Sequence, residues 1–296
     1  MAGGRGRWYR ENVRWGDYRA SDQVEDRRGL PVGRGGVAIG GGGLLLLLAF
    51  AVLTGQNPLD LIGVLSEPQV SVDQGPIGRA GAPTDEQGRF AAVVLASTED
   101  VWRAQFRRRG REYQLPALVL FSDAVRSACG FSSAAVGPFY CPPDRKLYLD
   151  LSFFRELADR FGAPGDFARA YVIAHEVGHH VQNLLGVMDR VHAAQRGPDA
   201  NELSVRLELQ ADCFAGVWGH DAGRDANLLE PGDVEEGLAA AAAIGDDRLQ
   251  RESQGYVVPE KWTHGSSAMR VRWLRRGLET GDPSACDTFG SAHAEP

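Results

Sequence analysis

The segment from His175 to His179 reads H-E-V-G-H, and it constrains this chain more than any other feature of the sequence. Histidines four positions apart lie one turn above each other on the same face of an α-helix, so their imidazole nitrogens can converge on one metal ion. Glu176 follows the first histidine, about 100° round the helix, and can reach a water molecule beside that ion. This pattern is typical of zinc hydrolases in which the glutamate is the general base.

The residues around this motif favour a buried helix. Between Ala170 and Gln182, Glu176 is the only charged residue. The alternative is a surface helix with two unrelated histidines, which should show polar residues at several exposed positions. Burying a charge in an otherwise apolar helix is costly unless the charge has a partner or a function. The apolar residues around Glu176 therefore favour a functional role for it.

The N-terminal part of the sequence predicts a membrane anchor. No charged residue occurs between Gly35 and Leu59, and a spanning helix needs about 20 mostly apolar residues. We therefore expect a transmembrane helix over residues 35–55. The arginines precede it, so the positive-inside rule predicts a basic cytoplasmic segment over residues 1–34, a single-pass protein of the cell membrane and an extracytoplasmic catalytic domain. A cleaved signal peptide is the alternative, but its charged region would be unusually long.

The remainder of the chain is acidic. The net charge is −7, and residues 1–54 hold eight arginines and five acidic residues, so the rest carries −10. This balance argues against general nucleic-acid binding. We expect a linker over residues 56–88, which are rich in Gly, Pro, Asp and Gln, then a folded domain over residues 89–290 and a tail over residues 291–296.

The folded domain shows a few strand patterns and then many helix patterns. Strands are expected at residues 117–121, 136–140 and 146–151, and Pro138 places the second of them at a sheet edge. Helices are expected at residues 90–109, 153–161, 166–185, 201–219, 233–249 and 266–279. This order predicts an α+β fold.

The four cysteines, all beyond the predicted anchor, indicate disulfide bonds, because an even number in an exported domain is typical of them. Cys129 and Cys141 enclose a short loop and pair most naturally with each other, which leaves Cys213 with Cys286. Four cysteines allow three connectivities, and their spacing does not decide among them.

A third zinc ligand is needed, because a catalytic zinc ion takes three protein ligands and a water molecule. Gln182 and Leu185 occupy the positions of the glycine and third histidine of metzincins, which excludes that class. The alternative source is a second helix, where Glu208 follows His179 by 29 residues and has apolar neighbours. Asp212 lies one turn further and can accept the free N–H of a ligand histidine. A solvated surface face is the alternative for both carboxylates.

One further histidine has a candidate role in catalysis. His264 lies in a loop before the last expected helix, where it can donate a hydrogen bond to the oxyanion of a tetrahedral intermediate. An ordinary surface histidine is the alternative. Four others fit a ligand role poorly because they point away from the pair, follow a helix end, or lie in a loop or the tail: His180, His192, His220 and His293.

Several segments, in the same order along the chain, resemble a known family, the neutral zinc metallopeptidases, which are single-pass bacterial membrane proteins. The matching segments are residues 21–29, 129–130, 137–142, 148–150, 175–182, 208–213, 244–247, 263–266 and 286–289. This family is in turn similar to the gluzincin proteases. The resemblance implies a zincin-like (gluzincin) domain with short N-terminal strands and a mostly helical C-terminal part, preceded by one transmembrane helix.

The resemblance also implies roles for particular residues. One Zn²⁺ ion per chain is expected on His175, His179 and Glu208, with Glu176 as the general base. His264 takes the role that steadies the oxyanion. An edge strand is expected to pair with an extended peptide substrate, and its residues are Gly137, Pro138, Phe139 and Tyr140.

The expected function is therefore hydrolysis of peptide bonds in a peptide or protein substrate by a membrane-anchored zinc enzyme. Two alternatives remain. One is a catalytically silent zinc-binding scaffold of the cell envelope, against which the intact Glu176 argues. The other is a zinc amidase that acts on non-peptide amides.

Overall fold

The computed structural model describes residues 15–30, 78–194, 197, 199–226 and 228–290. Residue contacts group Met1–Gly29 with Gly78–Pro296 in one compact unit. Residues 15–29, which we expected outside the folded domain, therefore lie within it. Val24 is 1% exposed, and burial of such apolar side chains ties this segment to the core.

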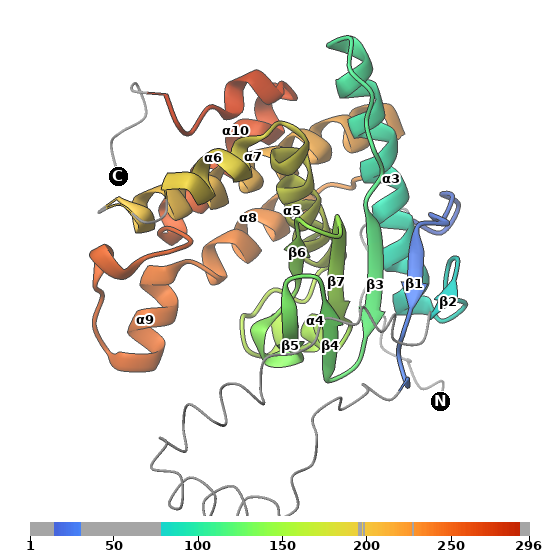
Figure 1. Ribbon diagram of the computed structural model, residues 1–296, viewed down its shortest axis with the longest axis horizontal. Coiled ribbons are helices and arrows are strands. Elements are labelled where there is room, and N and C mark those ends of the chain that lie inside the picture. The colour runs from blue at the N-terminus through green and yellow to red at the C-terminus, as the bar shows by residue number, and fades with distance from the viewer. Residues whose placement is uncertain (1–14, 31–77, 195–196, 198, 227, 291–296) are drawn as a thin grey trace, which may run out of the picture. The chain divides into compact units, whose positions relative to one another are not determined.

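A five-stranded sheet forms one layer of this unit, in the order β2-β1-β3-β7-β6 (Figure 1). β1 (Val24–Asp26), β3 (Ala117–Phe121) and β7 (Lys146–Asp150) are parallel to one another. β2 (Arg79–Ala80) and β6 (Phe139–Cys141) pair antiparallel at the two edges. β3 is apolar throughout because both faces of the sheet are covered.

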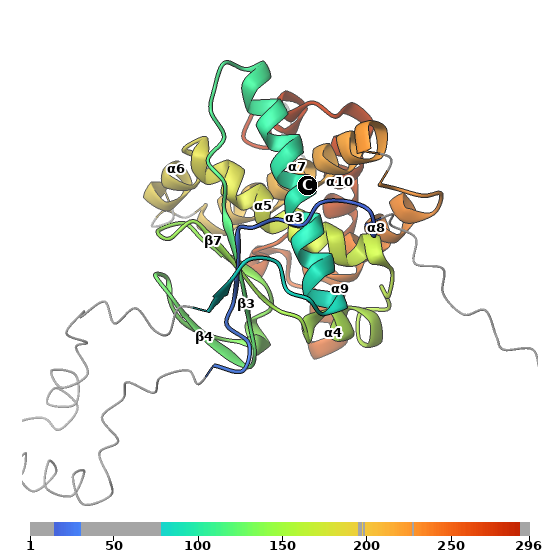
Figure 2. The same ribbon diagram turned by 90° about the vertical axis from the view of Figure 1, so that its right-hand side faces the viewer.

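The two faces of the sheet are covered differently (Figure 2). On one face lie the hairpin of β4 (Ala124–Ser127) and β5 (Gly130–Ser133) and the short helix η1 (Ala134–Val136). Side chains from this hairpin and the sheet form a small apolar cluster there. The main core lies on the opposite face, beneath the helices.

Helices make up the rest of the unit. In chain order they are α3 (Glu86–Arg108), α4 (Phe153–Asp159), α5 (Asp166–Leu184), α6 (Val187–Ala194), α7 (Ala200–Ala226), α8 (Asp233–Ala243), α9 (Asp246–Gln254), η2 (Pro259–Lys261), α10 (Ser267–Thr280) and η3 (Pro283–Cys286). α7 and α10 cross at a glycine pair, Gly216 and Gly277. A methyl group on Gly277 would lie 2.0 Å from the carbonyl oxygen of Cys213, so the two backbones approach each other directly.

Most expected elements are present, but β1, β4, β5 and α6 were not expected, and three further differences follow. β2 and the start of α3 lie in residues expected to be linker. The expected helix over residues 233–249 is two helices, because Gly245 interrupts it and packs against the backbone of Ser267, 2.3 Å from where its methyl group would lie. The expected strand over residues 136–140 begins only at Phe139, because Gly137 adopts a φ of +86° after η1.

The expected transmembrane helix requires a correction. Residues 35–55 lie outside the described residues, and within the described part of the chain no helix is long and apolar enough to cross a membrane. The longest helices there, α3, α5 and α7, each carry several charged residues. The fold class is therefore an α+β, mostly helical domain, and the expected transmembrane helix and single-pass membrane localisation are not supported.

The two disulfide bonds have the pairing that the short loop between Cys129 and Cys141 favoured. Cys129 pairs with Cys141, and Cys213 pairs with Cys286. The first ties the hairpin to edge strand β6. The second ties η3 to α7, across 73 positions of sequence.

Candidate active site

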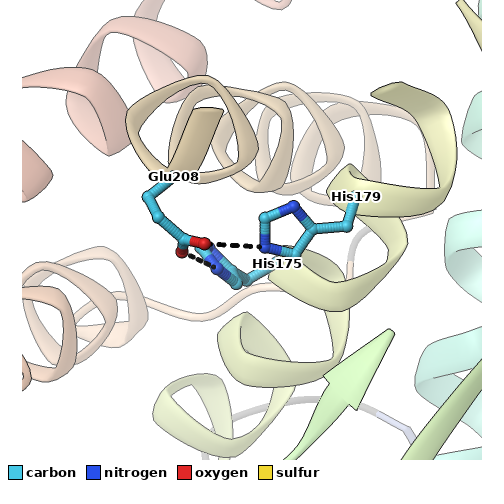
Figure 3. A group of neighbouring side chains, drawn as sticks. All are labelled: His175, His179 and Glu208. Atoms are coloured by element: carbon cyan, nitrogen blue, oxygen red, sulfur yellow. Dashed lines mark hydrogen bonds and ion pairs between the residues drawn. The ribbon is translucent and has the colours of Figure 1, made fainter. Parts of the chain in front are cut away.

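Helices α5 and α7 bring three expected ligands together (Figure 3). His175 and His179 come from α5 and Glu208 comes from α7, and one ligand atom from each lies within 4.8 Å of the others. Glu208 Oε2 is 3.1 Å from His175 Nε2, and Glu208 Oε1 is 3.4 Å from His179 Nε2. Both histidines are buried, whereas the Glu208 side chain is 18% exposed, so the cluster is open to solvent on the glutamate side.

The glycine of the H-E-V-G-H motif allows this approach. Gly178 faces α7, and a methyl group placed on it would lie 2.9 Å from the carbonyl oxygen of Ala211 and 3.1 Å from its Cα. Both are backbone atoms that cannot turn aside. The contact therefore sets the distance between the two helices that supply the ligands.

Gly178→Ala is expected to weaken zinc binding about tenfold or more, because the methyl group pushes α5 away from α7, and over-packing typically costs about 1–3 kcal/mol. Competition with a zinc-binding dye measures the affinity. Gly223→Ala is the matched control, since its methyl group would meet only side-chain atoms of Leu229. Equal zinc affinity in the two variants would contradict the role given to this contact.

A buried carboxylate orients the first histidine. His175 Nδ1 donates to Asp212 Oδ1 at 2.8 Å. Arg270 of α10 donates to both oxygens of Asp212 at 2.9 Å, and the hydroxyl of Tyr171 donates to Oδ1 at 2.6 Å. Because these donors hold Asp212 ionised, Nδ1 of His175 carries the proton and its Nε2 lone pair can face a metal ion.

The charges in this cluster shift its pKa values. Burial opposes the pKa rise of His175, but the Asp212 and Glu208 carboxylates overcome it and raise the pKa to about 10. Burial alone would raise the pKa of Asp212, but the charges of Arg270 and His175 and their hydrogen bonds lower it to about 2. A metal ion must therefore displace a proton from His175, so metal binding here is coupled to proton release.

Two glutamines orient the second histidine. His179 Nδ1 donates to Gln182 Oε1 at 2.8 Å. Gln182 Nε2 in turn donates to the Leu207 carbonyl at 2.6 Å and to Gln210 Oε1 at 3.2 Å. Gln210 donates to the carbonyl of Cys286 at 2.9 Å, so the ring of His179 is held by a chain of hydrogen bonds that ends at the second disulfide.

Glu176 lies beside the ligand cluster and is only partly buried. Burial raises the pKa of its carboxyl group, and the nearby His179 and His175 oppose this rise. A general base works best with a pKa near the working pH, so a raised pKa suits Glu176 to this role.

Asp246, the first residue of α9, organises the loop that carries His264. Its Oδ2 accepts backbone N–H groups from Thr263 and His264 at 2.7 Å and from Gly265 at 3.1 Å. Its Oδ1 lies 3.2 Å from His264 Nδ1. Four contacts from one carboxyl group fix both the loop backbone and the ring.

The loop lies against the helix that carries Glu208. Gly265 has a φ of +90°, and a methyl group on it would lie 3.2 Å from Val205 on α7. The pKa of His264 is raised, first by its hydrogen bond to Asp246 and also by the charge of Glu208, while burial opposes the rise. The ring is about half exposed, so it is open to solvent.

Asp246→Asn is expected to lower the pKa of His264 towards its ordinary value, which NMR titration of the ring measures. The raised pKa contributes stability that is present below about pH 6.5 and is lost as pH rises through the folded pKa, so the variant should lose this pH dependence. Asp247→Asn is the control, because Asp247 contacts Ser267 rather than His264. An unchanged His264 titration would contradict the pairing.

His180 is a structural residue that joins α5 to the edge strand. Its Nε2 donates to the Gln114 carbonyl at 2.7 Å, and its Nδ1 accepts from the Tyr140 hydroxyl at 3.0 Å. Asn183 also donates to that hydroxyl at 2.8 Å. His180 is fully buried, and burial lowers its pKa to about 4, so the ring is neutral. β6 is thereby fixed beside the motif helix.

Among the described residues, His192 and His220 contribute no ligand atom to the metal cluster. His220 on α7 donates from Nδ1 to the Leu278 carbonyl at 2.8 Å. His192 is exposed on α6, and His293 lies outside the described residues.

The donor set fits zinc. Two neutral imidazoles and one carboxylate are a known ligand set of catalytic zinc, and such a site keeps a position for water. Each histidine has its Nδ1 occupied by a partner and its Nε2 directed to Glu208. The site therefore offers a carboxylate and two correctly oriented nitrogens.

Sequence reasoning missed the residues that hold the ligands in place. Arg270 carried a usable signal, because it shares the apolar face of α10 with Trp273, Leu274 and Gly277, where a charge requires a buried partner. No comparable signal marked Tyr171, Gln182 or Gln210, because polar side chains on helices are common.

A motif helix with two histidines and a second helix with a glutamate define a zinc-hydrolase type of site. The chain belongs to the family described as "Putative neutral zinc metallopeptidase", whose model matches residues 13–289. The expected family is thus confirmed.

Proteins from Escherichia coli and Mycobacterium tuberculosis are similar to the chain. The uncharacterized protein YpfJ of Escherichia coli K12 is 48% identical over 292 residues, which cover 95% of this chain and all of YpfJ. The uncharacterized protein Rv2575 of Mycobacterium tuberculosis H37Rv is 45% identical over 224 residues, which cover 72% of this chain and 75% of Rv2575. No solved structure matches the chain significantly.

Proposed function

We propose that this protein is a peptidase that holds one zinc ion on His175, His179 and Glu208 and hydrolyses peptide bonds with Glu176 as the general base. The observation that carries the proposal is the cluster itself, in which two oriented imidazoles and a carboxylate meet beside a glutamate of raised pKa. Membership of a zinc metallopeptidase family supports it.

The chain's own residues perform the proton transfers. Glu176 takes a proton from the attacking water as the water oxygen bonds to the peptide carbonyl carbon. It then passes this proton to the amide nitrogen, so that the carbon–nitrogen bond breaks and a neutral amine leaves. A zinc ion bound in the cluster supplies Lewis-acid chemistry, which polarises the carbonyl and makes water more acidic.

His264 assists at the carbonyl oxygen. Asp246 lies beside its Nδ1, which leaves Nε2 to donate a hydrogen bond to that oxygen as it gains negative charge. The raised pKa of His264 favours the protonated, donating ring. The substrate lies along β6, which adds its backbone hydrogen bonds to an extended peptide.

The test is zinc content and hydrolysis measured on the same preparation of the full chain. We expect about one zinc ion per chain, cleavage of an unfolded protein substrate, loss of cleavage with a chelator and recovery with zinc. Glu208→Ala should lose the metal, whereas Glu202→Ala, an exposed glutamate on the same helix, should keep it. Bound zinc without cleavage of protein or peptide substrates would favour a silent scaffold, and cleavage of non-peptide amides alone would favour an amidase.

A further inference from the structure

The disulfide Cys129–Cys141 closes a loop at the edge of the sheet. This disulfide loop, residues 129–141, contains β5, η1 and β6. Its first residue lies at the hairpin turn, and its last residue ends the edge strand, with the two Cα atoms 5.8 Å apart. The bond therefore fixes the hairpin beside β6 without using the sheet's own hydrogen bonds.

Large apolar side chains are exposed in this loop. Phe131 of β5 is 63% exposed and Val136 of η1 is 67% exposed. Among the described residues, the other exposed large apolar side chains are Tyr256, which is 62% exposed, and Leu30, which is 37% exposed. Single exposed apolar residues are ordinary, but two in one short, covalently restrained loop mark a binding surface.

The same region carries no charge. Residues 127–143 contain no Lys, Arg, Asp or Glu, although these residues make up 24% of the chain. Burial does not explain the run, because most of its described side chains are exposed or partly exposed. Arg126 of β4 lies opposite Phe131 in the hairpin, and the loop residues themselves offer apolar and uncharged groups to a ligand.

The loop is continuous with the candidate active site. Tyr140 in β6 contacts His180 and Asn183 of the motif helix, so the edge strand lies next to the turn that carries His179. β6 pairs with β7 on one side and has no strand on the other side among the described residues. A peptide bound at the cluster could therefore pair with the free edge of β6. Val136 precedes this strand in the chain, and Phe131 lies in β5, which the disulfide joins to β6.

We propose that the disulfide loop selects the substrate: an extended polypeptide segment with uncharged, apolar side chains pairs with β6 and packs those side chains on Phe131 and Val136. The proposal rests on the proposed function and adds a substrate class to it. Backbone pairing with β6 is independent of sequence, so the two apolar side chains supply the preference. The fixed loop reduces the ordering that binding would otherwise require.

The test compares two peptides of equal length that differ only beside the scissile bond, one with Leu, Val and Phe and one with Ser, Asp and Lys. For Phe131→Ser with Val136→Ser we expect KM for the apolar peptide to rise about tenfold or more, the usual value of an apolar contact in a specificity site, with kcat little changed. Tyr256→Ser is the matched control, since Tyr256 is 62% exposed but lies outside the loop. Equal KM in the double variant and the control would overturn the proposal.

A binding measurement separates failure of this proposal from failure of the proposed function. In the Glu176→Gln background, fluorescence anisotropy with the labelled apolar peptide should show binding that the Phe131 and Val136 substitutions weaken about tenfold. Weakened binding would support the recognition surface even if no cleavage occurred. Unchanged binding would overturn it even if cleavage were intact. A dimer in sedimentation that the substitutions abolish would also overturn it, because the loop would then hold a second copy of the chain.

Discussion

Glu176→Gln is expected to lower kcat/KM for peptide hydrolysis by about 10² to 10⁴, the usual contribution of a general base, while zinc content stays the same. Glutamine has nearly the same shape but cannot accept a proton. Glu176 contributes no ligand atom to the cluster of His175, His179 and Glu208, so the metal should remain. A large decrease in kcat/KM with unchanged zinc content would identify Glu176 as the general base.

The measurement is steady-state cleavage of one peptide by both proteins, with zinc determined by mass spectrometry. Glu202→Gln is the control, because Glu202 lies on α7 in solvent and pairs with Arg206. Cleavage by the Glu176→Gln variant within a few-fold of the unchanged protein would exclude Glu176 as the base. Loss of zinc in that variant would show instead that Glu176 helps to hold the metal.

Arg270→Ala is expected to destabilise the fold by about 3–5 kcal/mol, because it leaves the carboxylate of Asp212 buried without its main counter-charge. Asp212 is fully buried and Arg270 is 3% exposed, so water cannot replace the lost contacts. The pKa of Asp212 should rise, since burial then acts with less opposition. The ring of His175 loses its firm partner, and zinc affinity should fall as well.

Urea unfolding with and without zinc measures both effects. Arg272→Ala is the matched control, since Arg272 is an exposed arginine two positions further along the same helix. A double variant, Arg270→Met with Asp212→Asn, should be more stable than Arg270→Ala, because it no longer buries an unpaired charge. Equal stability of Arg270→Ala and Arg272→Ala would show that the pair contributes nothing.

The sequence predicted those parts of the site in which spacing along one helix determines geometry. His175 and His179 follow from a four-residue period, and Glu208 and Asp212 follow from the same period on a second helix. How the two helices approach depends on Gly178 meeting Ala211, a contact between residues 33 positions apart. A periodicity argument contains no information about such contacts.

The fold was predictable where apolar patterns are long. The central strands β3 and β7 and helix α5 stand close to their expected bounds. β1 was missed, because its three residues, Val24 to Asp26, include two acids within a charged segment. Its place in the sheet comes from pairing with β3, which lies more than 90 positions later in the chain.

The ligands belong to two helices, and this has a thermodynamic consequence. A zinc ion held by both α5 and α7 is a cross-link between them, and it binds the folded chain far better than the unfolded one. By mass action, the folding free energy would increase with free zinc, by about 2.7 kcal/mol at one hundred times the dissociation constant. The concentration of free zinc would then change the stability of this protein as well as its activity.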